Sequence, residues 1–160
     1  MRSLFFCMLA VAGPAFGLSC KAPNFAEDFN RIAAVEEVYS VAYGQLRELG
    51  LVPPAVDGEP RSVKMRFVGR MLGQRGFGET GTVDVTVNTT CAGSFCGPLP
   101  TTQTPLLAFL EHADGGMTLR SAACAPDYHI NPSLGQVSAI RACMRALNCG
   151  ADEIDAFAPH

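Results

Sequence analysis

The sequence predicts a mainly β protein, a closed five-stranded barrel with a short N-terminal helix and a C-terminal helix, held together by disulfides. Three observations predict this fold class. Five segments have the composition or the two-residue period of β-strands. Two further segments carry helix-capping residues ahead of apolar side chains at helical spacing. Six cysteines remain once an N-terminal segment with the features of an export signal is set aside.

The N-terminus has the three-part pattern of a cleavable export signal. Arg2 is followed by the apolar run 4–12 and then by small residues that allow cleavage after Gly17 or after Ser19. The apolar run is too short to span a bilayer. We therefore expect residues 1–19 to be a signal peptide and the mature protein to be secreted or periplasmic, with no membrane span.

A short helix is expected next. Asn24 and Glu27 resemble a capping pair, and Phe25, Phe29 and Ile32 recur behind the cap at helical spacing.

Five strand segments follow the helix. The first, VYSVAYGQL (38–46), is rich in β-branched and aromatic residues. SVKMRFVGRM (62–71) and TVDVTVN (82–88) alternate apolar and polar side chains, as a strand with one wet face does. LLAFLEH (106–112) and GMTLRSA (116–122) are joined by a turn rich in Asp and Gly. The long, irregular connections between strands favour a closed barrel over a flat sheet.

The C-terminal helix is indicated by a capping box formed by Ser133 and Gln136. We expect its apolar stripe to pack on the barrel and Gly150 to end it. The stripe consists of Val137, Ile140, Met144 and Leu147. Residues 20–150 then form one domain, and residues 151–160 form an acidic, loosely held tail.

The six remaining cysteines predict a disulfide framework, because an even number in a small exported chain is typical of structural bridges. They are Cys20, Cys91, Cys96, Cys124, Cys143 and Cys149. Six cysteines allow fifteen pairings, so the connectivity stays open. Cys143 and Cys149 can pair only if the C-terminal helix breaks between them.

The stretch TTCAGSFCG (89–97) places Cys91 and Cys96 five positions apart. A zinc site needs four nitrogen or sulfur ligands, and the histidines are scattered along the chain. A redox pair prefers Cys-x-x-Cys at a helix start, which is absent here. We expect structural disulfide ends and neither a metal nor another cofactor.

Three motifs that could carry chemistry lack the context they need. GFGETG (76–81) precedes a strand, whereas the dinucleotide fingerprint opens a helix. Ser94 lacks the glycines of a nucleophile elbow. Lys64, Arg66 and Arg70 form a basic stripe without interleaved aromatics in a chain of net charge −3. We therefore predict a protein without catalytic residues that does not bind nucleic acid.

The order of the elements carries a family resemblance. A cysteine lies near the mature N-terminus (Cys20), a Cys-Gly follows the third strand (Cys96-Gly97), and the last hairpin ends in Ala-Ala-Cys (122–124). Over residues 20–135 this arrangement resembles the inhibitory domain of tissue inhibitors of metalloproteinases and the related netrin modules. The resemblance implies an OB-type five-stranded barrel with its N-terminal segment strapped to it by disulfides.

The resemblance also bears on the pairing of Cys20. In that family the N-terminal cysteine bonds to the Cys-Gly position, and a second cysteine two residues later bonds to the hairpin cysteine. This sequence has only the first of the two. Cys20 is therefore left to bond to Cys96 or to Cys124.

A site follows from the same resemblance. The free α-amine and carbonyl of Cys20 would chelate the zinc of a metalloprotease, and Lys21 and Ala22 would enter its cleft. Ser94 and Phe95 would form the adjoining ridge. Chelation requires Cys20 to be the mature N-terminus, because two preceding residues would block the amine.

The sequence thus favours an exported, non-catalytic module that binds a protein partner, with a metalloprotease as the narrower expectation. Two alternatives stay open. One is a surface lipoprotein lipidated at Cys20, since Gly17-Leu18-Ser19-Cys20 faintly resembles a lipoprotein signal. The other is an exported thiol–disulfide protein, which would need a free thiol of low pKa.

Overall fold

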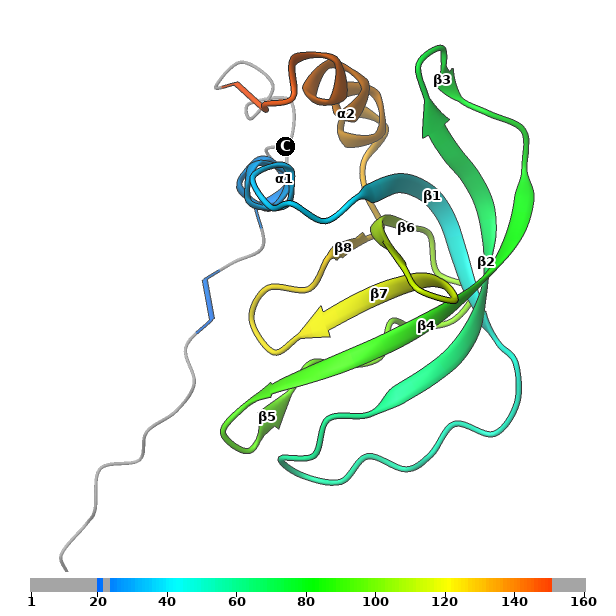
Figure 1. The fold of residues 1–160 in the computed structure, drawn as a ribbon, viewed down its shortest axis with the longest axis vertical. Helices are drawn as coiled ribbons and strands as arrows, with labels where there is room; N and C mark the ends of the chain where they lie inside the picture. The colour runs from blue at the N-terminus through cyan, green and yellow to red at the C-terminus, as the bar shows by residue number, and fades with distance from the viewer. Residues whose placement is uncertain (1–19, 22–23, 151–160) are drawn as a thin grey trace, which may run out of the picture.

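The computed structural model describes residues 20–21 and 24–150. The predicted signal peptide and the acidic tail lie outside the described residues. In the described part of the chain (Figure 1), the elements are α1 (Phe25–Ala33), β1 (Tyr39–Glu48), β2 (Ser62–Gly73), β3 (Gly76–Phe77), β4 (Gly81–Ala92), β5 (Phe95–Cys96), β6 (Leu106–Ala113), β7 (Gly116–Ala122), β8 (Tyr128–Ile130) and α2 (Leu134–Ala146).

Five of the strands close into a barrel, which confirms the predicted fold class. β1 pairs with β2 and β6, β2 pairs with β4, and β6 pairs with β7, all antiparallel. A parallel pairing of β4 with β7 closes the ring. This order, with the third and fifth barrel strands parallel, is that of an OB-type barrel. The two-residue strands β3 and β5 and the three-residue β8, which the sequence did not predict, extend β2, β4 and β6.

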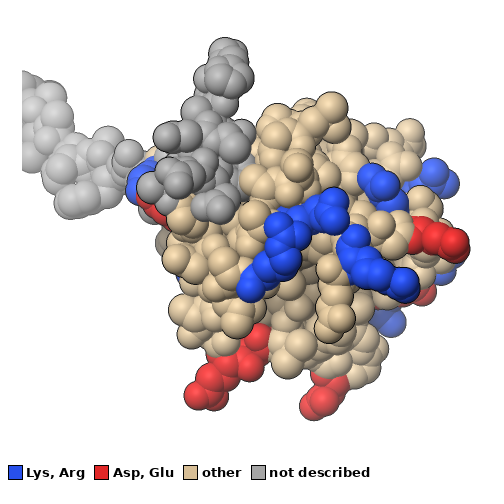
Figure 2. Space-filling view, turned by 90° about the horizontal axis from the view of Figure 1, so that it is seen from above, with Lys and Arg blue, Asp and Glu red and all other residues tan. Residues whose placement is uncertain are grey.

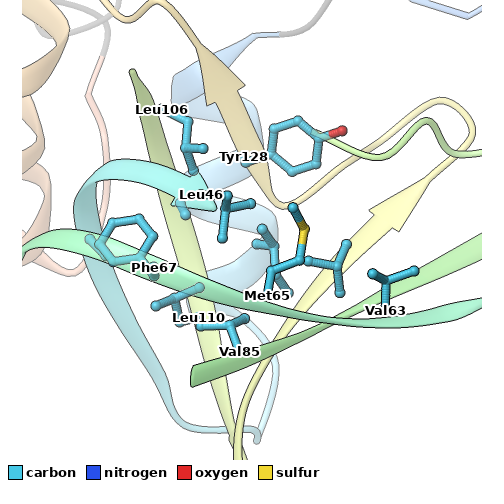
Figure 3. Close-up of a cluster of buried hydrophobic side chains, with 12 residues drawn as sticks. Leu46, Val63, Met65, Phe67, Val85, Leu106, Leu110 and Tyr128 are labelled. Atoms are coloured by element: carbon cyan, nitrogen blue, oxygen red, sulfur yellow. The ribbon is translucent and has the colours of Figure 1, made fainter. Parts of the chain in front are cut away.

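The alternation of side chains along the strands builds the interior. On β2, Val63, Met65 and Phe67 are buried while Lys64 and Arg66 are exposed, as the period of two requires. Figure 3 shows Leu46, Met65, Phe67 and neighbouring side chains converging between the strands. The buried members of this interior core are Ala42, Leu46, Val63, Met65, Phe67, Val85, Val87, Leu106, Ala108, Leu110, Leu119 and Tyr128.

A second core lies outside the barrel wall, under the two helices. β6 is buried on both faces from Leu106 to Leu110, because its outward side chains Leu107 and Phe109 are covered as well. The residues of this outer core are Phe25, Ala26, Phe29, Ile32, Val41, Leu107, Phe109, Ile140, Cys143 and Cys149. Both helices therefore cover the outer surface of β1 and β6.

The N-terminal helix begins as predicted. The side chain of Asn24 accepts a hydrogen bond from the backbone N–H of Glu27 at 3.1 Å, which satisfies one of the free donors of the first turn. Phe25, Phe29 and Ile32 are buried, so the helical spacing identified the correct face.

The C-terminal helix begins at the predicted capping box and ends earlier than predicted. Ser133 and Gln136 exchange hydrogen bonds of 3.1 Å and 2.7 Å. The helix stops at Ala146, and Leu147 caps it in the left-handed conformation with φ 52°. The expectation that Gly150 ends the helix and that Leu147 packs on the barrel is wrong, since Leu147 is 74% exposed. The reversal at Leu147 instead returns the chain toward Cys143.

Two facing glycines allow β1 and β2 to approach closely. Gly44 is the register partner of Gly69. A Cβ on Gly44 would lie 2.6 Å from the Cα of Gly69 and 2.8 Å from the ring of Phe67. Neither position can carry a side chain without displacing its neighbour.

Candidate binding surface

The six cysteines of the described residues form three disulfides, which confirms the predicted framework. They join Cys20 to Cys124, Cys91 to Cys96, and Cys143 to Cys149. The last bridge is possible because the helix ends at Ala146, between its two cysteines.

Cys20 takes one of the two partners left open by the sequence. It bonds to Cys124 at the end of the last hairpin, across a sequence separation of 104 residues. Cys96 is not available, because β4 and β5 form a tight hairpin in which Cys91 and Cys96 are register partners. The Cys-Gly position therefore closes its own hairpin and does not hold the N-terminus.

Two of the disulfides lie at the same end of the barrel, which we call the strapped end. The parallel pairing of β4 and β7 runs to Thr90 opposite Ala122. Cys91 follows the first residue directly, and Ala123 and Cys124 follow the second. The Sγ of Cys20 lies 3.6 Å from the carbonyl oxygen of Ala123. The strapped end consists of Cys20, Lys21, the segment 91–96, Ala123 and Cys124.

The predicted ridge forms the tip of the β4–β5 hairpin. Ser94 and Phe95 are exposed, and Phe95 keeps 52% of its surface accessible. The tip is braced from one side, because the N–H of Gly58 donates to the carbonyl of Ser94 at 3.2 Å. Lys21 pairs with Glu27 at 2.7 Å. Ala22 lies outside the described residues, and no described contact joins Phe95 directly to Cys20.

Gly97, the glycine of the Cys-Gly pair, has a packing role that the sequence did not reveal. Its N–H donates to the carbonyl of Thr90 at 3.0 Å. A Cβ at this position would overlap the backbone carbonyl of Ser121 on β7. The chain leaving the hairpin thus passes directly against β7, and the next residue, Pro98, accepts a hydrogen bond from the hydroxyl of Tyr128 at 3.0 Å.

A buried carboxylate ties α1 to the segment that carries Cys124. Asp127 is 1% exposed and receives bidentate hydrogen bonds from Arg120 on β7, at 2.7 Å and 3.0 Å. Arg31 on α1 bridges Asp127, at 3.0 Å, and Asp28, at 3.2 Å. His129 Nε2 lies 3.2 Å from Oδ2 of Asp28. The sequence did not predict this network, because its two halves are distant in the chain; Arg31 and Asp127 are 96 positions apart.

The carboxyl of Asp28 has a lowered pKa. Burial alone would raise it, but hydrogen bonding and charge interactions with His129 and Arg31 outweigh burial and stabilise the ionised form. The N-terminal segment is therefore fixed to residues 124–129 twice, covalently through Cys20 and electrostatically through α1.

One serine–histidine pair invites a catalytic interpretation. Ser40 Oγ and His112 Nε2 are 2.8 Å apart on the exposed surfaces of β1 and β6. A hydrolase needs a third group to orient the imidazole and donors for an oxyanion. In the described part of the chain no carboxylate contacts His112, and the pair lies across two neighbouring strands of a regular ladder. It is best explained as a cross-strand hydrogen bond.

The described residues contain neither a metal-binding cluster nor a membrane-spanning helix. No group of three His, Cys, Asp or Glu side chains among them could hold a metal ion. No helix within residues 20–21 and 24–150 is long and apolar enough to cross a bilayer.

Comparison with known proteins found no matching family model, no matching curated protein and no matching solved structure. The resemblance to metalloproteinase inhibitors and netrin modules therefore stays a prediction.

Proposed function

We propose that the mature chain is an exported, non-catalytic binding module whose strapped end contacts a protein partner. The observation that carries the proposal is Phe95, an aromatic side chain left half exposed at the tip of a hairpin that the Cys91–Cys96 disulfide closes. Large aromatic side chains on rigid supports are the usual anchors of protein interfaces.

The rigidity of the β4–β5 hairpin is a second observation that supports a binding role for the strapped end. The hairpin is closed by a disulfide at its base and braced at Ser94, so little conformational freedom would be lost when Phe95 entered a pocket. The N-terminal segment is held by Cys124 at the same end of the barrel. Two separate chain segments are thus presented to a partner in a fixed relation.

Export is supported by the disulfides, because three bridges in a chain of this size are typical of oxidising compartments. The same bridges weigh against both alternatives. Lipidation would place a thioether on Cys20 and exclude its bond to Cys124, since both use one sulfur atom. A thiol–disulfide protein would require one of the bridges to open during its reaction.

A metalloprotease is the narrower candidate partner. The α-amine and carbonyl of Cys20 would bind the protease zinc, and Lys21 and Ala22 would follow into the cleft. The disulfide to Cys124 would hold that terminus in place, although it uses the hairpin cysteine where the inhibitors use the Cys-Gly position. Phe95 and Ser94 would then contact the rim of the cleft.

The inhibitor version is tested by the position of the mature N-terminus. Two forms of the protein are prepared, one beginning at Cys20 and one at Leu18, and mass spectrometry verifies the three disulfides in each. Inhibition of a zinc metalloprotease catalytic domain is measured with a fluorogenic peptide. The Cys20 form is expected to inhibit and the Leu18 form to lose most of the inhibition. Equal effects of the two forms, or none from either, would exclude zinc chelation by Cys20.

The broader proposal is tested with Phe95→Ala. Leu134→Ala serves as the matched control, because Leu134 is also an exposed large apolar residue, 84% accessible, but lies on α2. Photo-crosslinking in the exported fraction of the source cells is expected to yield a defined adduct that Phe95→Ala loses and Leu134→Ala keeps. An adduct that survives Phe95→Ala would remove the strapped end from the interface.

A further inference from the structure

A groove lies between α2 and the β2–β3 hairpin, at the end of the molecule away from β5 (Figure 1). Its volume is about 530 Å³, within the range of small-ligand sites. We call it the arginine groove; it is lined by Leu72, Gly73, Gln74, Gly76, Arg141, Met144 and Arg145. Figure 2 shows Lys and Arg side chains gathered across the middle of this face, with Asp and Glu toward its margins.

The arginines around this groove have no carboxylate partners among the described residues. Elsewhere in the described chain, Arg31, Arg66 and Arg120 form ion pairs with aspartates, whereas Arg47 and Arg61 form none with a described residue. Arg141 and Arg145 line the groove, Arg75 contacts Arg141, and Arg70 lies over Phe77 of the same hairpin; no ion pair joins any of the four to a described residue. Four guanidinium groups that form no ion pair with the described residues give this face a local positive charge in a chain of net charge −3, which favours the binding of an anion.

Two of these arginines are held in place by neutral contacts. The guanidinium of Arg141 lies against Gly76, and its Nη2 donates to the carbonyl of Arg75 at 3.2 Å. Arg70 lies over the rings of Tyr43 and Phe77, at 5.8 Å and 5.7 Å from their centroids. Because these contacts do not neutralise the charge, and no described carboxylate does, the groups can bind a carboxylate or phosphate, which arginine holds in a bidentate manner.

An apolar groove adjoins the arginine groove, and Met144 belongs to the lining of both. It runs between α1, α2 and β1 with a volume of about 180 Å³. Its lining is Phe29, Ile32, Ala33, Val35, Glu37, Tyr39, Val41, Phe109, Met144 and Leu147. Val35 and Leu147 are 45% and 74% exposed at its rim, an arrangement that leaves apolar surface in water.

The charges at the two grooves give a ligand one preferred direction. Among the described residues, Glu37 is the one charged residue in the apolar lining, while Arg141 and Arg145 line the other groove beyond Met144. An anionic headgroup is repelled by Glu37 and attracted by the arginines. An attached alkyl chain would therefore extend from the arginine groove past Met144 toward Val35 and Leu147.

We propose that the two grooves together bind a single-chain anionic amphiphile, with a carboxylate or phosphate headgroup on Arg141 and Arg145 and one alkyl chain in the apolar groove. The ligand needs both the anionic headgroup and the alkyl chain, because one groove supplies positive charge and the other supplies apolar surface. This site is separate from the strapped end and does not rest on the function proposed there.

The test is calorimetric titration of the full mature chain with four probes below their aggregation concentrations. Decyl phosphate and decanoate are expected to bind with one-to-one stoichiometry. Decyl maltoside, which lacks the charge, and inorganic phosphate, which lacks the chain, are expected to bind at least tenfold more weakly. The stronger of the two anionic probes identifies the source, a phosphate-headed lipid or a free fatty acid.

Three variants assign the binding to the grooves. Arg141→Gln combined with Arg145→Gln is expected to weaken decyl phosphate binding at least tenfold and to leave decyl maltoside unchanged. Leu147→Glu, at an exposed rim position, is expected to weaken both anionic probes. Arg47→Gln is the control, since Arg47 is exposed and unpaired but lies on β1 outside both linings. Circular dichroism verifies that each variant is folded.

Three results would overturn the proposal. Binding of decyl maltoside as tight as that of decyl phosphate would mean a purely apolar groove. Binding of inorganic phosphate as tight as that of decyl phosphate would mean a simple anion site. An unchanged affinity in the Arg141→Gln, Arg145→Gln variant would place the ligand elsewhere. Phe95→Ala should leave the affinities for all four probes unchanged. Failure of the amphiphile proposal can therefore be distinguished from failure of the binding function proposed for the strapped end.

Discussion

Arg31 on α1 and Arg120 on β7 donate hydrogen bonds to the same oxygen of Asp127, at 3.0 Å and 2.7 Å. One buried carboxylate thus joins the N-terminal helix to the barrel wall. The carbonyl of Asp127 also accepts from the N–H of Phe109 on β6, so three elements meet at this residue.

Asp127→Asn is expected to destabilise the fold strongly, because the variant removes the counter-charge of the partly buried Arg120 and leaves Arg31 paired with Asp28 alone. Removing one partner of a buried ion pair costs about 3 to 5 kcal/mol, and the partial exposure of the two arginines places the expectation near the lower value. The free energy of unfolding is measured by urea titration. Asp84→Asn, which removes the solvent-exposed partner of Arg66, should leave the urea midpoint nearly unchanged. Equal effects of the two variants would contradict the bridging role of Asp127.

Asp28 should make the stability of the protein depend on pH in the acid range. Its pKa is lowered in the folded state, chiefly because His129 and Arg31 outweigh the effect of burial, so the unfolded chain binds its proton more readily. The stabilisation is fully present above the unfolded value near 3.8 and is lost as the pH falls through the lower folded pKa. The difference in unfolding free energy between wild type and Asp28→Asn should therefore be larger at pH 6 than at pH 3. A difference that stays constant would show that the ion pairs of Asp28 do not stabilise the fold.

Local patterns in the sequence predicted the strands and helices of the barrel, because alternation and capping depend on residues that are close together in the chain. The alternation along 62–71 and 82–88 identified strands whose inward side chains are buried, and the capping residues placed the starts of both helices. The helix end was expected at Gly150 and lies at Ala146, between the two cysteines of the Cys143–Cys149 bridge. Because the pairing of the six cysteines stayed open, the requirement that this bridge places on the helix could not fix its end.

The contacts of the charged residues could not be predicted from the sequence, because they join residues that are far apart in the chain. Lys64, Arg66 and Arg70 appeared as one basic stripe, but the fold gives them different environments. Arg66 pairs with Asp84 on β4, while Arg70 lies on two aromatic rings beside the arginine groove. Arg75 and Arg141 are 66 positions apart and meet only because α2 folds back over the β2–β3 hairpin.

The Cys20–Cys124 disulfide is expected to contribute more stability than Cys91–Cys96. In the chain-entropy account, a loop of about 100 residues stabilises by about 5 kcal/mol and a loop of about six residues by about 2 kcal/mol. Urea unfolding of the Cys20→Ser, Cys124→Ser double variant should therefore show the larger loss, with the Cys91→Ser, Cys96→Ser variant as the comparison. Equal losses would mean that contacts of α1 hold the N-terminal segment without the covalent strap.

Gly97→Ala is expected to disrupt the strapped end although it adds only one methyl group. The new Cβ would overlap the backbone carbonyl of Ser121, and backbone on a barrel strand cannot yield as a flexible side chain can. The required shift would break the hydrogen bond from Gly97 to Thr90 or the parallel pairing of β4 with β7, at a cost of about 1 to 3 kcal/mol. Gly81→Ala is the matched control, because a Cβ there meets nothing within 4 Å. Hydrogen exchange should show faster exchange in the segment from Thr90 to Gly97 in the first variant and no change in the second. If the two variants exchange alike, the close approach at Gly97 does not hold the hairpin, and the rigid presentation of Phe95 loses its structural basis.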